Sequence, residues 1–194
     1  MPLRDVLTPK PRVLFVGINP SLRSEAVGHH FAGPGNPFWR LLYAARLVPV
    51  ELTHTEDHRL AEFGLALTNL CPRATRAAAE LSREEIERGK RRLTAKIRHL
   101  GPEVVAFVGV TIYRDFFGKA PTKASGRPSI ETASASATAS AGEGAKTERI
   151  CGAKVFVLPN PSGLNASFPG FKHKLVWFER LREFIDLGAA YRVP

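Results

Sequence analysis

The sequence is poor in cysteine and has no long apolar run. Its 194 residues include only two cysteines, Cys71 and Cys151, which lie far apart and form no CxxC pair. This excludes a disulfide framework and a four-cysteine zinc or iron–sulfur site, and predicts two buried, reduced thiols. No apolar stretch approaches the ~20 residues of a membrane span, and residues 1–11 lack the apolar segment of a signal peptide. We therefore expect a cytoplasmic protein without membrane contact.

Two common nucleotide-binding motifs are also absent. The chain contains neither G-x-G-x-x-G nor G-x-x-x-x-G-K-[ST], which argues against a nucleotide-binding or regulatory module of the doubly wound class. His54 and His58 are four residues apart, but two ligands do not make a metal site. We expect no bound metal.

Positive charge is in excess. Lysine and arginine number 28 against 18 acidic residues, which gives a formal net charge of +10. Such a charge attracts a polyanion, and neutralised phosphates supply most of the sequence-independent affinity for DNA. A generally basic proteome would give the same excess, so charge makes nucleic acid a candidate partner without identifying the chemistry.

Short apolar segments alternate with amphipathic ones along the chain. Strands are expected at residues 13–16, 65–67, 104–108 and 155–158. Helices are expected at residues 38–45, 82–100 and 173–187. This alternation predicts one α/β domain over residues 1–194, with a largely parallel sheet covered on both faces and ligands beyond the carboxyl ends of its strands.

One segment has the composition of a surface insertion. Residues 121–148 are rich in Ala, Ser, Thr and Gly, contain no aromatic residue, and have Ile130 as their only large aliphatic. Such a segment cannot bury enough apolar area to offset its ordering entropy. We expect a flexible, low-complexity insertion within the domain.

Polar motifs follow three of the predicted strands. The first strand leads into Gly-Ile-Asn-Pro-Ser-Leu at residues 17–22 and then into a Gly-, His- and aromatic-rich block at 28–39. The second ends in Leu-Thr-Asn-Leu at 67–70, and the last is followed by Leu-Pro-Asn-Pro-Ser-Gly-Leu-Asn at 158–165. Any one of these motifs is compatible with an ordinary turn. Three polar loops at three strand ends instead predict one shared site.

These motifs resemble the mismatch-specific uracil/thymine-DNA glycosylase family of the uracil-DNA glycosylase superfamily. The resemblance covers nearly the whole chain apart from the insertion. It implies a three-layer α/β/α sandwich with a short, mainly parallel central sheet, and no cofactor or metal. It also implies a monomeric, monofunctional enzyme on double-stranded DNA, associated with the nucleoid if the source is bacterial. Such an enzyme flips uracil, mismatched thymine or modified cytosine, preferentially opposite guanine, and hydrolyses the N-glycosidic bond to leave an abasic site.

The resemblance gives Asn19 the role of positioning the attacking water. Relatives in the wider superfamily carry an acidic residue there, whereas an amide cannot act as a strong general base. The chemical step should therefore be slow and depend on donors for the departing base, including the backbone N–H of Phe31. A carboxylate elsewhere in the chain remains possible as an assistant.

The resemblance also implies a base pocket and a DNA-opening loop. Phe31 stacks on the base, Asn69 faces its pyrimidine edge, and Ile18 and His30 complete the pocket, with His30 also a possible phosphate contact. The resemblance also puts Gly163 and Asn165 beside the opposite guanine and Ser162 at a phosphate, and Leu164, an apolar residue at a loop tip, suits the wedge in the DNA stack. Arg73 and Arg76 come just after Asn69 and are expected to contact DNA phosphate because they neighbour this site.

Two alternatives remain open at the level of sequence. One is a glycosylase from a neighbouring branch of the superfamily with another base preference. The other is a catalytically weak or inactive protein of the same fold that binds damaged DNA.

Overall fold

The computed structural model describes residues 3–118, 142–162 and 170–190. The strands are β1 (Val13–Gly17), β2 (Leu65–Asn69), β3 (Val104–Val108), β4 (Gly144–Ile150) and β5 (Ala153–Leu158). The helices are α1 (Leu22–Val27), α2 (Phe38–Ala44), α3 (Arg83–Leu100), α4 (Val110–Phe117) and α5 (Phe171–Ala190), with 3₁₀ helices η1 (His54–Phe63) and η2 (Ala78–Glu80). The four predicted strands and three predicted helices are all present, with ends that differ by a few residues.

The central sheet has the order β2-β1-β3-β5-β4. Its first four strands run parallel, and β4 pairs antiparallel with β5. Because the carboxyl ends of the parallel strands meet at one edge, the loops that follow β1, β2, β3 and β5 gather there.

Strand β4 corrects the predicted insertion. Residues 144–148 form most of β4, so the prediction of a flexible insertion is wrong for this end, while residues 121–141 lie outside the described residues. The sequence did not predict this strand because it is a polar strand at the edge of the sheet. Its side chains alternate between partly buried and exposed, and it has no apolar run.

A two-residue turn joins β4 to β5. Both turn residues, Cys151 and Gly152, have positive φ angles of 51° and 89°, as tight hairpin turns require. Cys71 is buried as predicted, but Cys151 is exposed because it occupies this turn, so the prediction of a second buried thiol is wrong.

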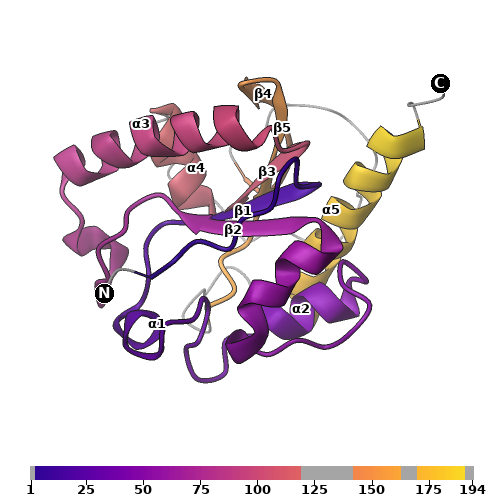
Figure 1. Ribbon diagram of the computed structural model, residues 1–194, viewed down its shortest axis with the longest axis horizontal. Coiled ribbons are helices and arrows are strands. Elements are labelled where there is room, and N and C mark those ends of the chain that lie inside the picture. The colour runs from indigo at the N-terminus through magenta and orange to yellow at the C-terminus, as the bar shows by residue number, and fades with distance from the viewer. Residues whose placement is uncertain (1–2, 119–141, 163–169, 191–194) are drawn as a thin grey trace, which may run out of the picture.

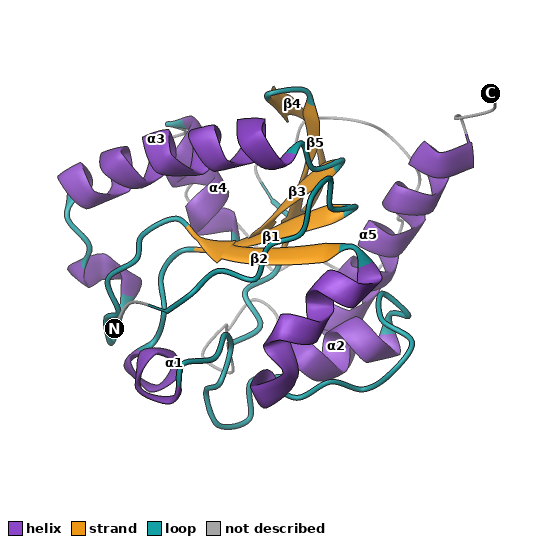
Figure 2. Ribbon diagram, viewed as in Figure 1, coloured by secondary structure: helices purple, strands orange, loops and turns teal. Residues whose placement is uncertain are grey.

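Helices cover both faces of the sheet, as Figures 1 and 2 show. Alternate side chains of each strand enter two separate cores, because successive residues of a strand point to opposite faces. One core packs α2, η1 and α5 against residues such as Phe15 and Val104, and the other packs α3 and α4 against residues such as Leu14 and Val105. The predicted three-layer α/β/α sandwich is confirmed.

Helix α3 begins and ends at the expected signals. Ser82 accepts a hydrogen bond from the backbone N–H of Glu85, whose carboxylate accepts one from the N–H of Ser82, and Gly101 ends the helix in a left-handed conformation. Near the middle of the helix, Gly89 brings the backbone against Leu70, immediately after β2.

None of the helices in the described part of the chain combines the length and the apolar composition that a membrane span needs.

Candidate active site

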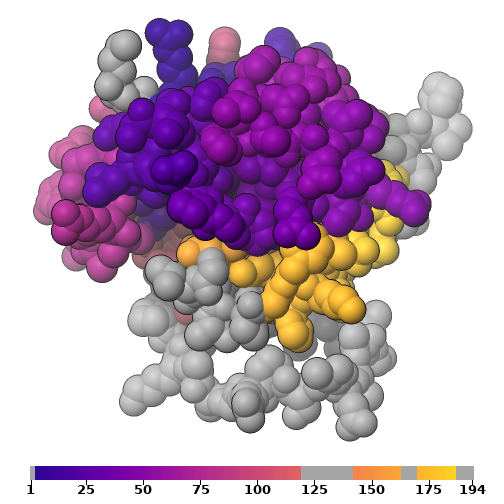
Figure 3. Space-filling model, turned by 90° about the horizontal axis from the view of Figure 1, so that it is seen from below, coloured from indigo at the N-terminus to yellow at the C-terminus, as the bar shows by residue number. Residues whose placement is uncertain are grey.

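A pocket of about 300 Å³ lies beyond the carboxyl ends of the strands. Its volume is at the lower end of the range for small-ligand pockets. Figure 3 shows the face on which the indigo and violet N-terminal segments meet the orange end of β5 and the yellow start of α5. The polar residues that line the pocket are Asn19, Ser21, Ser24, His30, Asn36, Asn69, Thr75, Arg76, Asn160 and Ser162. Residues of all three polar motifs therefore line one pocket.

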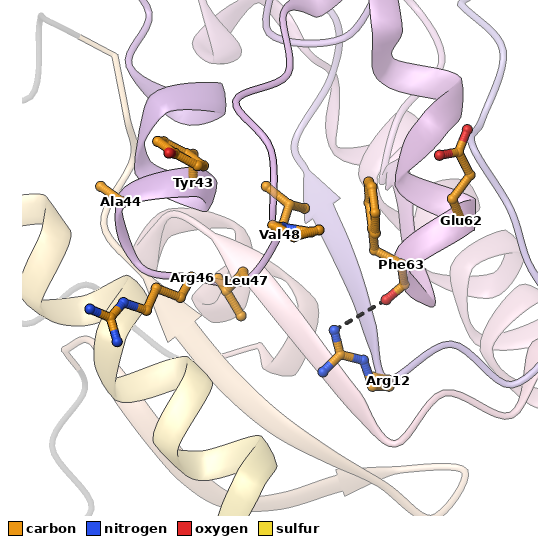
Figure 4. Close-up of a pocket in the computed structure, with 9 residues that line it drawn as sticks. Arg12, Tyr43, Ala44, Arg46, Leu47, Val48, Glu62 and Phe63 are labelled. Atoms are coloured by element: carbon orange, nitrogen blue, oxygen red, sulfur yellow. Dashed lines mark hydrogen bonds between the residues drawn. The ribbon is translucent and has the colours of Figure 1, made fainter.

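A second hollow, of about 800 Å³, lies at the opposite end of the sheet (Figure 4). Its lining includes Arg12, which precedes β1, and Phe63, which precedes β2. The guanidinium of Arg12 donates a hydrogen bond to the carbonyl oxygen of Phe63 at 3.1 Å. The hollow contains none of the predicted site residues, and it lies at the amino ends of the strands, where parallel sheets do not usually bind ligands.

The side chain of Asn19 is held in one orientation by the loop that follows β2. Its Nδ2 donates to the carbonyl oxygen of Arg73 at 2.8 Å and to Oγ1 of Thr75 at 2.7 Å. The hydroxyl of Thr75 in turn donates to the carbonyl oxygen of Ala77 at 2.8 Å, so it is free to accept from Asn19. Both contacts require the amide nitrogen, which assigns the amide without ambiguity. The other polar atom of the side chain, the acceptor oxygen Oδ1, is then the one that can bind a molecule in the pocket.

Backbone pairing beyond the sheet holds the same two loops together. The N–H groups of Leu70 and Cys71 donate to the carbonyl oxygens of Gly17 and Ile18, each at 2.8 Å, and the N–H of Thr75 donates to Pro20 at 3.2 Å. The loops after β1 and β2 therefore continue the contact of their strands. Ile18 lies between Gly17 and Asn19 on this frame and lines the pocket.

Asn69 closes the pocket from the end of β2. It is the direct partner of Gly17 in the parallel register between β1 and β2. A side-chain amide offers both donors and an acceptor, so it can meet the edge of more than one pyrimidine.

Phe31 is an aromatic platform on the pocket wall. Its ring stacks on that of Phe38 with centroids 3.9 Å apart and planes 21° from parallel. Its φ angle of 52° lies in the left-handed region, which costs a residue with a side chain roughly 1–2 kcal/mol. Strain of this kind persists where the surroundings impose it and is common at functional sites.

The backbone on either side of Phe31 is fixed by hydrogen bonds. The N–H of His30 donates to Oδ2 of buried Asp57 at 3.0 Å, and the N–H of Ala32 donates to Oγ of Ser24 at 3.3 Å. No acceptor for the N–H of Phe31 is found among residues 3–118, 142–162 and 170–190. This leaves one fixed backbone donor beside the stacking ring.

His30 is a buried, neutral residue of the pocket wall. Its Nε2 lies 2.8 Å from the carbonyl oxygen of Arg4, which can only accept, so Nε2 carries the proton. Burial lowers the pKa of His30 below its ordinary value of 6.5. His30 lines the same pocket as Phe31. His29 is partly exposed, and its Nδ1 lies 3.2 Å from Asp57 Oδ1.

Of the residues predicted to contact phosphate, Ser162 and Arg76 line the pocket, whereas Arg73 does not. Ser162 lines the pocket, and its backbone N–H donates to Oδ1 of Asn160 at 2.9 Å. Arg73 does not line the pocket, because its guanidinium makes a two-pronged ion pair with Glu85 at 2.6 and 2.9 Å. Exposed Arg76 reaches the pocket in its place. Gly163, Leu164 and Asn165 lie outside the described residues.

The chemistry available in the pocket is that of neutral polar groups. Its described lining holds Arg76 and the neutral imidazole of His30, with no carboxylate and no cysteine. Nor does the described part of the chain contain a cluster of three His, Cys, Asp or Glu side chains fit for a metal ion. An amide oxygen can orient water, and backbone and amide donors can stabilise an oxyanion, without a strong base.

Comparison with known proteins identifies the family. Residues 4–182 match the family model described as the uracil DNA glycosylase superfamily. The chain belongs to this superfamily. Such membership indicates a DNA glycosylase, an enzyme that acts on DNA and hydrolyses N-glycosidic bonds. The fold is also similar to the solution structure of a candidate uracil DNA glycosylase from Methanosarcina acetivorans, with a TM-score of 0.59, 17% identity, and coverage of 93% of this chain and 97% of that one.

Several residues that form or support this pocket carry no signal in the sequence. Thr75 orients Asn19, Asp57 holds the backbone before Phe31, and Leu3 forms part of the pocket wall. Each is distant in sequence from the residue it serves and belongs to no recognisable motif. Only the three-dimensional contacts identify them.

Proposed function

We propose that the protein is a monofunctional glycosylase that flips uracil, and also mismatched thymine or modified cytosine, from double-stranded DNA. It prefers a base opposite guanine, hydrolyses the N-glycosidic bond and leaves an abasic site. The observation that carries this proposal is the fixed amide of Asn19, whose donors are both taken by the neighbouring loop.

Asn19 positions the attacking water through Oδ1. A water held by a neutral acceptor gains orientation but little basicity, so the reaction depends on a dissociative, oxocarbenium-like transition state. The described pocket lining offers no carboxylate that would act as a stronger base.

The departing base is stabilised by neutral donors on a rigid wall. It stacks on Phe31, and its edge faces the amide of Asn69. The N–H of Phe31, which has no acceptor in the described part of the chain, donates to a carbonyl oxygen on which negative charge develops. Ile18 and His30 complete the pocket.

The loop after β5 opens the DNA. Leu164 enters the stack as an apolar wedge, Gly163 and Asn165 lie beside the opposite guanine, and Ser162 contacts phosphate. Arg73 is retained as a phosphate contact only if DNA competes with its ion pair to Glu85. Arg76 is the better placed cation.

Single-turnover cleavage of duplexes containing one G·U, G·T or modified G·C pair tests the reaction directly. Asn19→Ala should fold and bind DNA normally but cleave roughly 10²–10³ times more slowly, the loss expected for one preorganised polar group. An unchanged rate in folded Asn19→Ala would refute the mechanism. A wild-type chain that binds lesions without cleaving any of them would establish the alternative, an inactive damage-binding protein.

Leu164→Ala tests the wedge. It should slow cleavage in a duplex more than in single-stranded DNA, because only a duplex has a stack to open. Equal losses on both substrates would indicate general damage to the loop and contradict this role.

A further inference from the structure

A buried lysine lies against the loop that follows β5. Lys174, in the first turn of α5, is only 2% exposed. Its ammonium donates hydrogen bonds to the carbonyl oxygens of Pro161 and Ser162, each at 3.1 Å. These contacts hold the start of α5 against Pro161 and Ser162, which lie three and two residues before the proposed wedge Leu164.

The position of this charge is unfavourable in the free protein. Burial removes the ammonium from water and lowers the pKa of Lys174. The positive end of the α5 dipole opposes a cation in the first turn. No carboxylate lies within ion-pair distance of the ammonium in the part of the chain that the structure describes. Two carbonyl oxygens satisfy hydrogen bonds but do not neutralise the charge.

The ammonium lies next to the candidate active site. Ser162, whose carbonyl it binds, lines the same pocket as Asn19. Asn160, also in that lining, accepts from the backbone N–H of Ser162 at 2.9 Å. The segment from Asn160 to Ser162 is therefore held on one side by its own turn and on the other by Lys174.

We propose that Lys174 is a positioning residue whose uncompensated charge is neutralised by a phosphodiester of the bound DNA at Ser162. This inference rests on the proposed function, in which Ser162 contacts phosphate. An anion at that position supplies the countercharge that the described residues lack, and the carbonyl contacts keep the loop in place before DNA arrives.

The test is the salt dependence of binding to a duplex with an uncleavable abasic analogue opposite guanine. Each neutralised phosphate contributes roughly 0.9 to the slope of log affinity against log salt. Lys174→Met should bind roughly tenfold more weakly and with a slope shallower by about 0.9, because one charge-assisted phosphate contact is lost. Lys10→Met removes the same charge at the opposite end of β1 and should leave the slope unchanged.

Two further measurements separate a structural role from the proposed one. Lys174→Gln keeps donors for the carbonyl oxygens but has no charge, so it should fold and still show the shallower slope. In the unsubstituted chain, the ¹⁵N resonance of the Lys174 ammonium should shift when the abasic duplex binds. An unshifted resonance, or wild-type slopes in the folded variants, would overturn the proposal.

The proposed reaction and the proposed role of Lys174 are tested by separate measurements, cleavage and the salt dependence of binding. If the wild-type chain cleaves no duplex but the Lys174 variants show the shallower slope, the proposed reaction is wrong and the role of Lys174 stands. If cleavage is normal and the slopes are equal, only the role of Lys174 is lost.

Discussion

The side-chain oxygen of Asn69 occupies the space in which a side chain on Gly17 would begin. A Cβ atom built on Gly17 would lie 2.5 Å from Oδ1 of Asn69, closer than any real Cβ contact. The two residues are partners in the register of β1 and β2. The glycine therefore reserves room for the amide that is proposed to read the base.

Gly17→Ala tests this relationship. The added methyl group should displace the amide of Asn69 and slow single-turnover cleavage roughly tenfold, the cost of about one neutral hydrogen bond. The double variant Gly17→Ala/Asn69→Ala should be no slower than Asn69→Ala, because the methyl group then has nothing to displace. Additive losses would show that Gly17 acts through something other than Asn69.

Thr75 should matter through the orientation of Asn19. Thr75→Val keeps the shape of this buried side chain but removes the acceptor for Asn19 Nδ2, so the chemical step should slow roughly tenfold. Thr75→Ser retains the hydroxyl and should stay near the wild-type rate. Rapid-quench rates measured beside a thermal melt decide the matter. Equal rates in the Val and Ser variants would remove Thr75 from the mechanism.

Gly89 should be intolerant of even a small side chain. A Cβ there would lie 2.5 Å from the carbonyl oxygen of Leu70, a backbone atom that cannot move aside cheaply. Gly89→Ala should lower the free energy of unfolding by about 1–3 kcal/mol through overpacking, despite the better helix propensity of alanine. Ala95→Gly, at an exposed position of α3, should cost about 1 kcal/mol through propensity alone. Urea unfolding measures both, and a more stable Gly89→Ala chain would contradict the contact.

His30 should make the fold sensitive to acid. Its folded pKa is lowered by burial, so the unfolded chain takes up a proton from about pH 6.5 downward while the folded chain resists it. The contribution to the free energy of unfolding is complete above pH 6.5 and is lost as pH falls through the lower folded pKa. Denaturant unfolding at pH 8 and pH 5 should show a smaller acid loss in His30→Gln than in wild type. The exposed-site control His99→Gln should match wild type, and parallel losses in all three chains would rule out His30 as the cause.

The start of β4 defines two deletions whose effects on stability can be compared. Replacing residues 121–141 with a short Gly-Ser linker should leave folding and cleavage nearly unchanged, because that composition offers little to a core. Extending the deletion to residue 148 removes most of β4 and should destabilise the sheet, since β5 loses its antiparallel partner. Thermal melts compare the two. Similar stability in both deletions would show that β4 contributes little.

Most strands and helices with a buried apolar face could be predicted from the sequence, and those without one could not. The parallel strands are buried on both faces and read as apolar runs, and α3 carries its own start and stop signals, so these elements were predicted from local sequence. Strand β4 was not, because its polar alternation resembles the insertion that precedes it. Helix α1 was not predicted because Ser24 is its only buried residue, so it has no apolar face, and α4 was not because its β-branched and aromatic residues are typical of strands.

Site residues that belong to a continuous sequence motif could be predicted, and those outside such motifs could not. The roles of Asn19, Phe31 and Asn69 came from the resemblance of their motifs to the glycosylase family, whereas the strand ends beside Asn19 and Asn69 predict only that a ligand site lies there. Arg73 was predicted from the same neighbourhood, but its side chain turns to Glu85, twelve residues away, and sequence proximity does not reveal that choice. Lys174 was missed because a lysine in an amphipathic helix normally indicates a solvated face, and only the packed structure shows it buried.

The ring of Phe31 rests on Phe38, and Phe38 in turn contacts Phe15 of β1, Trp39 and Phe178 of α5. The surface proposed to stack on a flipped base is thus the outermost layer of the hydrophobic core, although Phe31 itself belongs to a loop. Loops normally adapt to different ligands independently of the fold, and this one cannot. Variation that reshapes the stacking surface must also repack the core beneath it, so selectivity for the base and stability of the fold are expected to change together during evolution.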